Sequence, residues 1–483
     1  GLYLEVAAAS NSATPNSSVN LNIEAINRSL QHIELVDITL SDGTKIEKNS
    51  DLKFNESHRF KSQINIPSSA SYSAPYWLNN KGTLGMYKVD DQNLIGLPEA
   101  PKTITATFNV LINDEIIAYT KPIIYKMNDP VKGEVYKPFE IVPEATSSIS
   151  ESVIIFADDQ QKDIQVIVKA NRNNVDGFVQ LEYPSGWTIY PEKQNFSIPH
   201  KGAEQTLAFT VIPPKNQNEG FIAPKVHIGN AIYTKKTVEI NYDHIPLQTI
   251  LLPNESKIVR LNLNKKGENI GYIEGAGDLV PESLRQIGYN VAIIKPEDIN
   301  METLKRFDAI VIGIRAYNTI DALKFKQKQL FEYVEQGGNL IVQYNTSGDI
   351  IVDQLAPYPL QLSRDRVTDE NAEVKLLNTT HELLNYPNKI TQKDFDGWVQ
   401  ERGLYFPNKW SKEFIPMLSM HDKGESPKEG SLLVAQYGKG YYIYTGLSFF
   451  REFPEGVAGA FRLFANMLSI GKETLKTDLR LKD

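Results

Sequence analysis

The stretch from Phe307 to Ser347 constrains the fold more than any other part of the sequence. It holds two short apolar runs, Ala309–Ile314 and Leu340–Val342, which are rich in β-branched residues and show no polar alternation. Such runs are typical of strands that are buried on both faces of a parallel sheet. The segment between them has apolar residues at helical spacing and ends at Gly337-Gly338, where a left-handed residue can stop a helix. The pattern predicts a strand–helix–strand unit with a right-handed crossover.

The ends of the predicted strands indicate where a ligand would bind. Ligands of open parallel sheets lie beyond the carboxyl ends of the strands. Polar and aromatic residues follow these strands, and a later irregular segment is able to fold over them. A carboxylate, a guanidinium and an indole together suit a polar, sugar-like ligand. The candidate binding residues are Glu274, Arg315, Tyr317, Tyr344, Asn345, Trp398, Glu401 and Arg402.

The irregular segment admits a second interpretation. Its charged residues could instead form a structural ion-pair network that pins a long loop, and truncation of a buried member would then cost several kcal/mol. The sequence leaves the binding site and the network as alternatives. The members of the network would be Arg364, Arg366, Asp369, Glu370, Glu401 and Arg402.

Composition narrows the classes of function. A chain of 483 residues is too long for one core and predicts several domains. The net charge of −8 argues against a nucleic-acid partner. A transmembrane helix needs about 20 consecutive apolar residues, and no apolar run in this sequence is that long. The absence of cysteine excludes disulfides, thiolate metal sites and cysteine nucleophiles. The seven histidines show no zinc-binding spacing, so we expect no metal. Gly275-Ala-Gly277 follows a strand but lacks the third glycine of a dinucleotide fingerprint, so we expect no cofactor in this chain.

The region before residue 247 has the period-two alternation of β-strands. Leu2, Leu4 and Val6 alternate with polar or small residues, and the same pattern returns up to residue 242. Residues 1–130 are predicted to form an antiparallel, Ig-like β-sandwich, and residues 131–246 are predicted to form a second one. The turn that holds Trp187 resembles that of the small β-sandwich module appended to some α-galactosidases.

Two aromatic features of these sandwiches have alternative interpretations. Tyr76, Trp77 and Tyr87 lie in a loop-like insert, where they could form a sugar platform or a small core beneath the loop. Trp187 follows a glycine in a turn, so it could stack on a sugar or fold back onto the sandwich core. The sequence does not decide either case.

From residue 247 onward the period changes to that of alternating helices and strands. Residues 247–475 are predicted to form a doubly wound α/β domain, followed by a charged tail at 476–483. The order of elements resembles the class I glutamine amidotransferase fold. That family needs a cysteine in the region that here reads Gln343–Thr346, which has no thiol, and a histidine where this chain has Phe450. The resemblance therefore implies an amidotransferase-like domain without its catalytic triad, a pseudoenzyme.

A second resemblance covers most of the chain. The runs Arg364–Glu370 and Pro387–Pro407 resemble the C-terminal region of long bacterial de-N-acetylases of the PIG-L type, which include N-acetylglucosaminyl-phosphatidylinositol de-N-acetylase. Gly1–Glu5 and Ile23–Ser29 resemble the segment that follows the catalytic domain of that family. The family's zinc site depends on an alanine-histidine-proline-aspartate-aspartate run, which this chain lacks. The resemblance implies an accessory region, with zinc held in a hydrolase domain encoded upstream of Gly1.

Two functions follow from different classes. In the first, this chain is the non-catalytic part of an exported, zinc-dependent N-deacetylase that acts on an N-acetylglucosamine-type sugar, and it serves as scaffold or as substrate- or partner-binding region. In the second, it is a free-standing carbohydrate- or protein-binding module. An enzyme with a novel site is a third interpretation, so enzyme status stays open. The absence of cysteine, the sandwiches and the resemblance favour a periplasmic or secreted bacterial protein.

Overall fold

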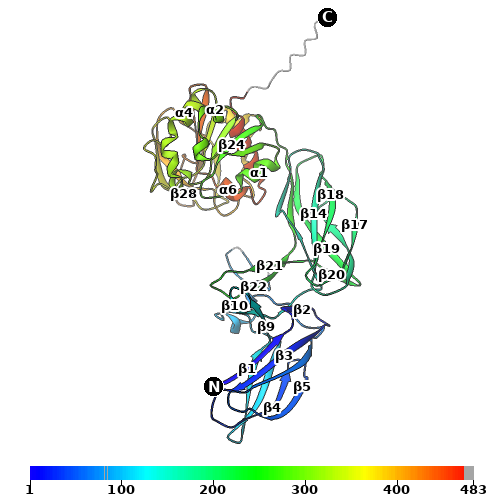
Figure 1. Ribbon diagram of the computed structural model, residues 1–483. Helices are drawn as coiled ribbons and strands as arrows, with labels where there is room; N and C mark the ends of the chain where they lie inside the picture. Colours follow the sequence, from blue (N-terminus) through cyan, green and yellow to red (C-terminus); the bar gives the residue numbers. More distant parts are fainter. Residues whose placement is uncertain (81, 84, 473–483) are drawn as a thin grey trace.

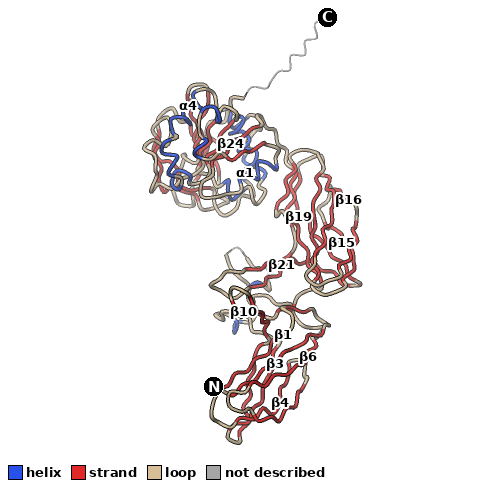
Figure 2. Tube along the Cα trace, in the orientation of Figure 1, coloured by secondary structure: helices blue, strands red, loops and turns tan. Residues whose placement is uncertain are grey.

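The structure is a computed structural model that describes residues 1–80, 82–83 and 85–472 (Figure 1). It is mostly β, with 44% of residues in strands and 13% in helices. Two β-sandwiches and a C-terminal part form a curved row, and the N-terminus lies on the sandwich farthest from the C-terminal part (Figure 1). The α-helices of the described residues all follow residue 279, as Figure 2 shows by their position in the C-terminal part.

The first sandwich packs a five-stranded sheet on a four-stranded sheet. Alternate residues of β3, such as Leu21 and Ile23, are buried in one core cluster with Phe108 of β7, because one face of each sheet turns inward. A pair of very short strands joins it to the next part of the chain. The sheets are β10-β9-β1-β3-β6 and β5-β4-β7-β8. The strands are β1 (Leu2–Ala8), β2 (Ser12–Ala13), β3 (Ser18–Asn27), β4 (Ile33–Leu40), β5 (Lys45–Asp51), β6 (Ser57–Asn65), β7 (Thr105–Ile112), β8 (Glu115–Pro122), β9 (Ile124–Asp129), β10 (Gly133–Pro138) and β11 (Glu140–Ile141).

The second sandwich has its own buried core. Trp187 lies in that core, packs edge-to-face on Phe156 at 5.0 Å and donates a hydrogen bond to Asn218 (2.9 Å), so its interpretation as a core residue is confirmed. The strand β23 pairs with β19, so this sandwich reaches past residue 246. Its strands are β12 (Ala145–Ile149), β13 (Val153–Phe156), β14 (Lys162–Ala170), β15 (Val175–Glu182), β16 (Thr188–Tyr190), β17 (Lys193–Ile198), β18 (Glu204–Ile212), β19 (Asn218–Ile228), β20 (Ala231–Tyr233) and β23 (Ser256–Arg260). A separate hairpin is formed by β21 (Lys235–Ile240) and β22 (Gln248–Pro253).

The C-terminal part is built on a seven-stranded mixed sheet of order β25-β24-β26-β27-β34-β33-β31. The predicted strand–helix–strand unit is confirmed, because β26 and β27 pair in parallel with α4 between them. Val311 belongs to the buried cluster that includes α7, whereas Ile310 and Ile312 belong to the cluster that includes α4. Burial on both faces explains why these strands show no polar alternation. The strands are β24 (Asn269–Ile273), β25 (Asn290–Ile293), β26 (Ala309–Ile312), β27 (Asn339–Val342), β31 (Ile415–Pro416), β33 (Leu432–Tyr437) and β34 (Gly440–Thr445).

The predicted doubly wound α/β domain of amidotransferase type is wrong. Strand residues far outnumber helical residues, and the molecule is divided among many small sheets. The region that sequence periodicity left irregular forms two further ribbons, β28 (Leu360–Val367) with β30 (Gly403–Trp410) and β29 (Val374–Leu376) with β32 (Leu418–Met420). Most helices are only one or two turns long. The helices are α1 (Val280–Gln286), α2 (Met301–Leu304), α3 (Ala316–Thr319), α4 (Gln327–Glu335), α5 (Glu382–Asn385), α6 (Phe449–Glu452) and α7 (Ala458–Ser469), with 3₁₀ turns η1 (Tyr76–Leu78), η2 (Gln92–Leu94), η3 (Pro296–Asp298), η4 (Asp321–Phe325) and η5 (Gln392–Phe395).

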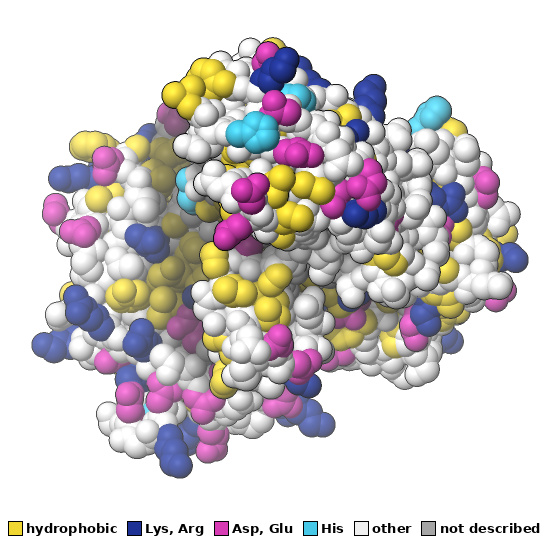
Figure 3. Space-filling view, turned by 90° about the horizontal axis from the view of Figure 1, so that it is seen from below, with side chains coloured by type: hydrophobic (Ala, Val, Ile, Leu, Met, Phe, Trp, Pro, Cys, Tyr) yellow, Lys and Arg dark blue, Asp and Glu magenta, His cyan; other side chains and the backbone are white. Residues whose placement is uncertain are grey.

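The surface carries charges of both signs. Basic and acidic side chains are interspersed on the face that Figure 3 shows, with apolar side chains between them. Among the described residues, no helix is both long and apolar enough to cross a membrane. The predicted charged tail at 476–483 lies outside the described residues.

Candidate functional site

Two of the predicted binding residues are structural. The ring of Tyr317 is fully buried, and its hydroxyl donates to the side-chain oxygen of Gln327 (2.7 Å). Asn345 is also buried; its side-chain oxygen accepts from the backbone N–H of Tyr317 (2.9 Å), and its amide donates to the carbonyl of Gln343 (3.0 Å). These bonds join the chain after β26 to the chain after β27. Both side chains are therefore buried and used inside the protein, and they are not exposed to a ligand at the strand ends.

Trp398 and Arg402 are part of the core. Trp398 is 3% exposed, packs 5.8 Å from the rings of Phe395 and Phe449, and donates its indole hydrogen to the carbonyl of Asp394 (3.0 Å). The guanidinium of Arg402 donates to the carbonyls of Ala372 (3.1 and 2.8 Å) and Phe395. Neither side chain covers the strand ends as the sequence predicted.

The predicted ion-pair network does not form either. Arg402 binds backbone carbonyls, and Glu401 pairs with Arg451 of α6 at 2.9 Å. In the part of the chain that the structure describes, the remaining four members make no ion pair with one another or with other residues. These four are Arg364, Arg366, Asp369 and Glu370.

Three of the predicted binding residues, Arg315, Tyr344 and Glu401, lie close together. Glu274 is exposed and makes no hydrogen bond or ion pair with the described residues. The ring of Tyr344 lies parallel to that of Tyr405 (centroids 6.3 Å apart) and 5.3 Å from that of Phe450. Burial raises the pKa of Tyr344, and the nearby guanidiniums of Arg315 and Arg451 oppose this shift. Arg315, Tyr344 and Glu401 are thus neighbours. Tyr405, Phe450 and Arg451 lie beside them but were not among the binding residues predicted from the sequence. Only the position of Phe450-Arg451 after another parallel strand, β34, could have indicated them.

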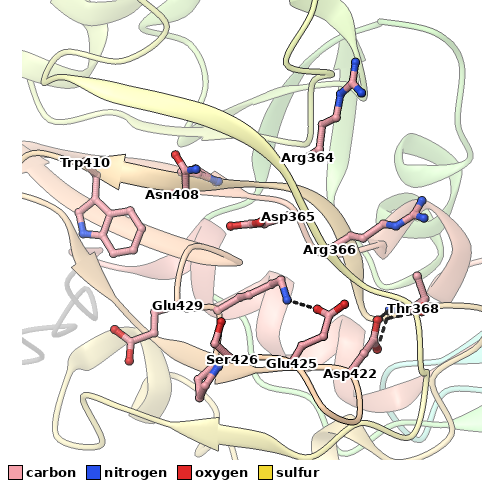
Figure 4. A pocket seen from close by; sticks show the side chains of 13 residues that line it. Arg364, Asp365, Arg366, Thr368, Asn408, Trp410, Asp422, Glu425, Ser426 and Glu429 are labelled. Atoms are coloured by element: carbon pink, nitrogen blue, oxygen red, sulfur yellow. Dashed lines mark hydrogen bonds and ion pairs between the residues drawn. The ribbon is translucent and has the colours of Figure 1, made fainter.

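A cavity of about 750 Å³ opens between β28, β30 and the loop at 421–430 (Figure 4). We call it the β28–β30 cavity. Its volume is typical of small-molecule sites, but charged and polar side chains dominate its lining. The lining residues are Arg364, Asp365, Arg366, Thr368, Pro407, Asn408, Trp410, Asp422, Glu425, Ser426, Pro427, Lys428 and Glu429.

Two interactions fix the loop that forms one wall of the cavity (Figure 4). The carboxylate of Asp422 accepts hydrogen bonds from the backbone N–H groups of Thr368 and Asp369 (2.9 Å each) and from the hydroxyl of Thr368 (2.9 Å). Burial alone would raise the pKa of Asp422, but these hydrogen bonds outweigh it and lower the pKa. Lys428 forms an ion pair with Glu425. The wall is therefore held in place before any ligand binds.

Other lining side chains remain available to a ligand. Within the described residues, the side chains of Asp365, Asn408 and Trp410 make no hydrogen bond or ion pair. Figure 4 shows Asp365 between the indole of Trp410 and the side chain of Glu425, while Arg364 extends away from them. The cavity thus offers a carboxylate, an amide and an indole together. The sequence missed Asn408 and Trp410, since only the long-range pairing of β28 with β30 brings them beside Asp365.

The aromatic insert of the first sandwich lines a second cavity of about 560 Å³. Tyr76 and Trp77 meet edge-to-face at 4.8 Å, and Tyr72 and part of β22 complete the wall. Tyr87 is 68% exposed and does not line this cavity. Neither Tyr76 nor Trp77 belongs to the buried core of the sandwich.

The described residues contain no group of three or more histidine, aspartate or glutamate side chains arranged to hold a metal ion.

Comparison with known proteins adds little to this geometry. No family model and no curated protein matches the chain.

Similar solved structures are distant. An exo-β-1,4-mannosidase of an Opitutaceae bacterium (strain TAV5) is 13% identical over 41% of this chain and 36% of its own, with a TM-score of 0.27. The α-2-macroglobulin of E. coli is 12% identical over 55% of this chain and 17% of its own, with a TM-score of 0.19. A Porphyromonas gingivalis W83 protein of unknown function is 7% identical over 54% of this chain and 98% of its own, with a TM-score of 0.16. Nothing about the function of this chain follows from scores this low.

Proposed function

We propose that this chain is a non-catalytic carbohydrate-binding region and that the β28–β30 cavity holds a neutral sugar of the N-acetylglucosamine type. The observation that carries the proposal is the group of Asp365, Asn408 and Trp410, which share one cavity and whose side-chain polar atoms make no hydrogen bond or ion pair with the described residues. The apolar face of a sugar ring stacks on an indole. A carboxylate accepts hydrogen bonds from sugar hydroxyls, and an amide both donates to and accepts from an acetamido group.

The position of the cavity in the sequence supports the same proposal. The run 364–370 contributes to the cavity wall, and the run 387–407 ends at Pro407, which also lines it. These two runs carry the resemblance to the accessory region of PIG-L-type de-N-acetylases. On this proposal, a zinc-dependent deacetylase domain precedes Gly1 in the parent protein, the whole is exported by a bacterium, and the cavity presents the sugar to that domain.

The proposal is tested by isothermal titration calorimetry of the chain with di-N-acetylchitobiose. Trp410→Ala and Asp365→Asn should each weaken binding about tenfold or more, which corresponds to about 1.4 kcal/mol. Trp410→Phe should retain part of the affinity, since it keeps a stacking face, and it separates loss of stacking from loss of fold. The matched control is Asp176→Asn, an exposed carboxylate of β15 on the second sandwich. Absence of binding by the unaltered chain, or equal affinity in all variants, would refute the proposal.

A further inference from the structure

Three residues of unusual backbone conformation point to a different site. Among the described residues, ten non-glycine residues have positive φ, and seven of them are asparagine or aspartate, which tolerate that region. The other three are Arg315 (55°), Gln400 (65°) and Tyr405 (53°). Residues of these types pay about 1 kcal/mol for a left-handed conformation.

Arg315 and Tyr405 both lie beside Tyr344 although they are far apart in the chain, and Gln400 joins this group through Arg451. The backbone N–H of Arg315 donates to the carbonyl of Tyr344 (2.8 Å), and the ring of Tyr405 lies parallel to the ring of Tyr344. The side chain of Gln400 accepts a hydrogen bond from Arg451. The guanidinium of Arg451 lies 4.9 Å from the centroid of the Phe450 ring, which is 5.3 Å from the centroid of the Tyr344 ring. We call Arg315, Tyr344, Tyr405, Phe450 and Arg451 the Tyr344 platform.

The strain at Arg315 is imposed by its neighbours. The carbonyl of Ile314 accepts from the N–H of Ala276 (2.9 Å), and the chain on the other side is held where the N–H of Tyr317 donates to Asn345. The loop after β24 packs so closely that a Cβ at Gly275 would lie 2.1 Å from the carbonyl oxygen of Ile314. Strained residues persist where the surrounding structure determines them fully, and they concentrate at functional sites.

The charges of the platform identify the class of ligand. Glu401 neutralises Arg451 through their ion pair, whereas the exposed guanidinium of Arg315 has no partner in the described part of the chain. The half-buried rings of Tyr405 and Phe450 flank Tyr344. Arg315 follows the end of β26 after Gly313 and Ile314, so it lies beyond the carboxyl end of a parallel strand, where ligands of such sheets bind.

We propose that the Tyr344 platform binds an oxyanion carried on a sugar ring, with the Arg315 guanidinium pairing to the oxyanion and the rings of Tyr405 and Phe450 contacting the sugar. Guanidinium pairs with carboxylate and phosphate through two parallel hydrogen bonds, so it suits either group. The site is separate from the β28–β30 cavity and does not depend on the function proposed for it.

The test uses the full chain with sodium glucuronate, glucose 6-phosphate and glucose, titrated by calorimetry at low and high salt. Glucuronate or glucose 6-phosphate should bind and glucose should not, and the anion that binds identifies carboxylate or phosphate as the natural group. High salt should weaken binding, since the guanidinium of Arg315 is exposed.

Arg315→Gly separates the guanidinium from the backbone. It keeps the left-handed conformation at no steric cost, so it should maintain or raise the melting temperature and still weaken anion binding about tenfold or more. Arg315→Lys should retain charge but lose the bidentate geometry and give an intermediate affinity. The control is Arg306→Ala, an exposed arginine paired with Glu302. Three results would each overturn the proposal: neither anion binds, glucose binds as tightly as the anions, or Arg315→Gly binds the anion with unchanged affinity. None of these results would affect binding of di-N-acetylchitobiose at the β28–β30 cavity.

Discussion

Glu452 is a buried carboxyl group whose pKa lies well above that of a glutamate in water. It ends α6, is fully buried, and accepts one hydrogen bond from the backbone N–H of Val399 (3.0 Å). Its other carboxyl oxygen has no partner among the described residues. Burial raises the pKa of Glu452 to about 8, although the Val399 amide and the charge of Arg402 oppose the shift. The side chain is therefore mainly a neutral acid at pH 7.

This pKa predicts how stability depends on pH. Because the pKa of Glu452 is higher in the folded than in the unfolded chain, folding binds a proton between about pH 4.5 and 8. The stabilisation is complete below that window and is lost as pH rises through 8. Glu452→Gln should remove this part of the pH dependence and be more stable than the unaltered chain at pH 9, as measured by urea unfolding at pH 5, 7 and 9. The control is Asp176→Asn, an exposed carboxylate of β15 on the second sandwich. Parallel pH profiles for Glu452→Gln and the unaltered chain would contradict the assignment.

At the scale of residues, the sequence did not predict which of the candidate binding side chains face solvent and which are used inside the protein. Tyr317, Asn345, Trp398 and Arg402 were chosen because they follow strands or lie in an irregular segment, yet their side chains are satisfied inside the protein. Nothing in the local sequence separates an arginine that binds carbonyls from one that faces solvent, such as Arg315. Burial is decided by segments far away in the chain.

At the scale of elements, local pattern predicted β26, α4 and β27, since each carries its own periodicity. It did not predict that β28 pairs with β30, because that ribbon has irregular register and joins segments about 40 residues apart, a separation that no local pattern reports. The β28–β30 cavity depends on this ribbon and on the 421–430 loop, so it could not be assembled from sequence.

The contact of α7 with η5 gives a test of element packing. A Cβ at Gly459 would lie 1.8 Å from the carbonyl oxygen of Asp394, whose carboxylate pairs with Arg462 of α7 at 2.7 Å. Gly459→Ala should push α7 away from η5 and lower the free energy of unfolding by about 1–3 kcal/mol. Chemical denaturation measures this change. Gly348→Ala is the matched control, since a Cβ there meets open space; an equal effect of the two substitutions would contradict the packing described.

At the scale of the whole molecule, the function that we propose for the chain is to bind a sugar for a deacetylase domain. The chain has no cysteine and no alanine-histidine-proline-aspartate-aspartate run. We predict that the chain alone releases no acetate from N-acetylglucosamine substrates, with or without added zinc. An acetate assay on the purified chain measures this directly, and zinc-stimulated release by the chain alone would contradict the accessory role.

The central claim, that the β28–β30 cavity is a sugar site, is tested most directly by a crystal structure of the chain grown with di-N-acetylchitobiose. We predict one sugar ring stacked on the indole of Trp410, with its polar groups bonded to Asp365 and Asn408, and a lower occupancy of the sugar in crystals of Asp365→Asn at the same concentration. A sugar bound elsewhere while the cavity holds only water, or the same occupancy in Asp365→Asn, would contradict the claim.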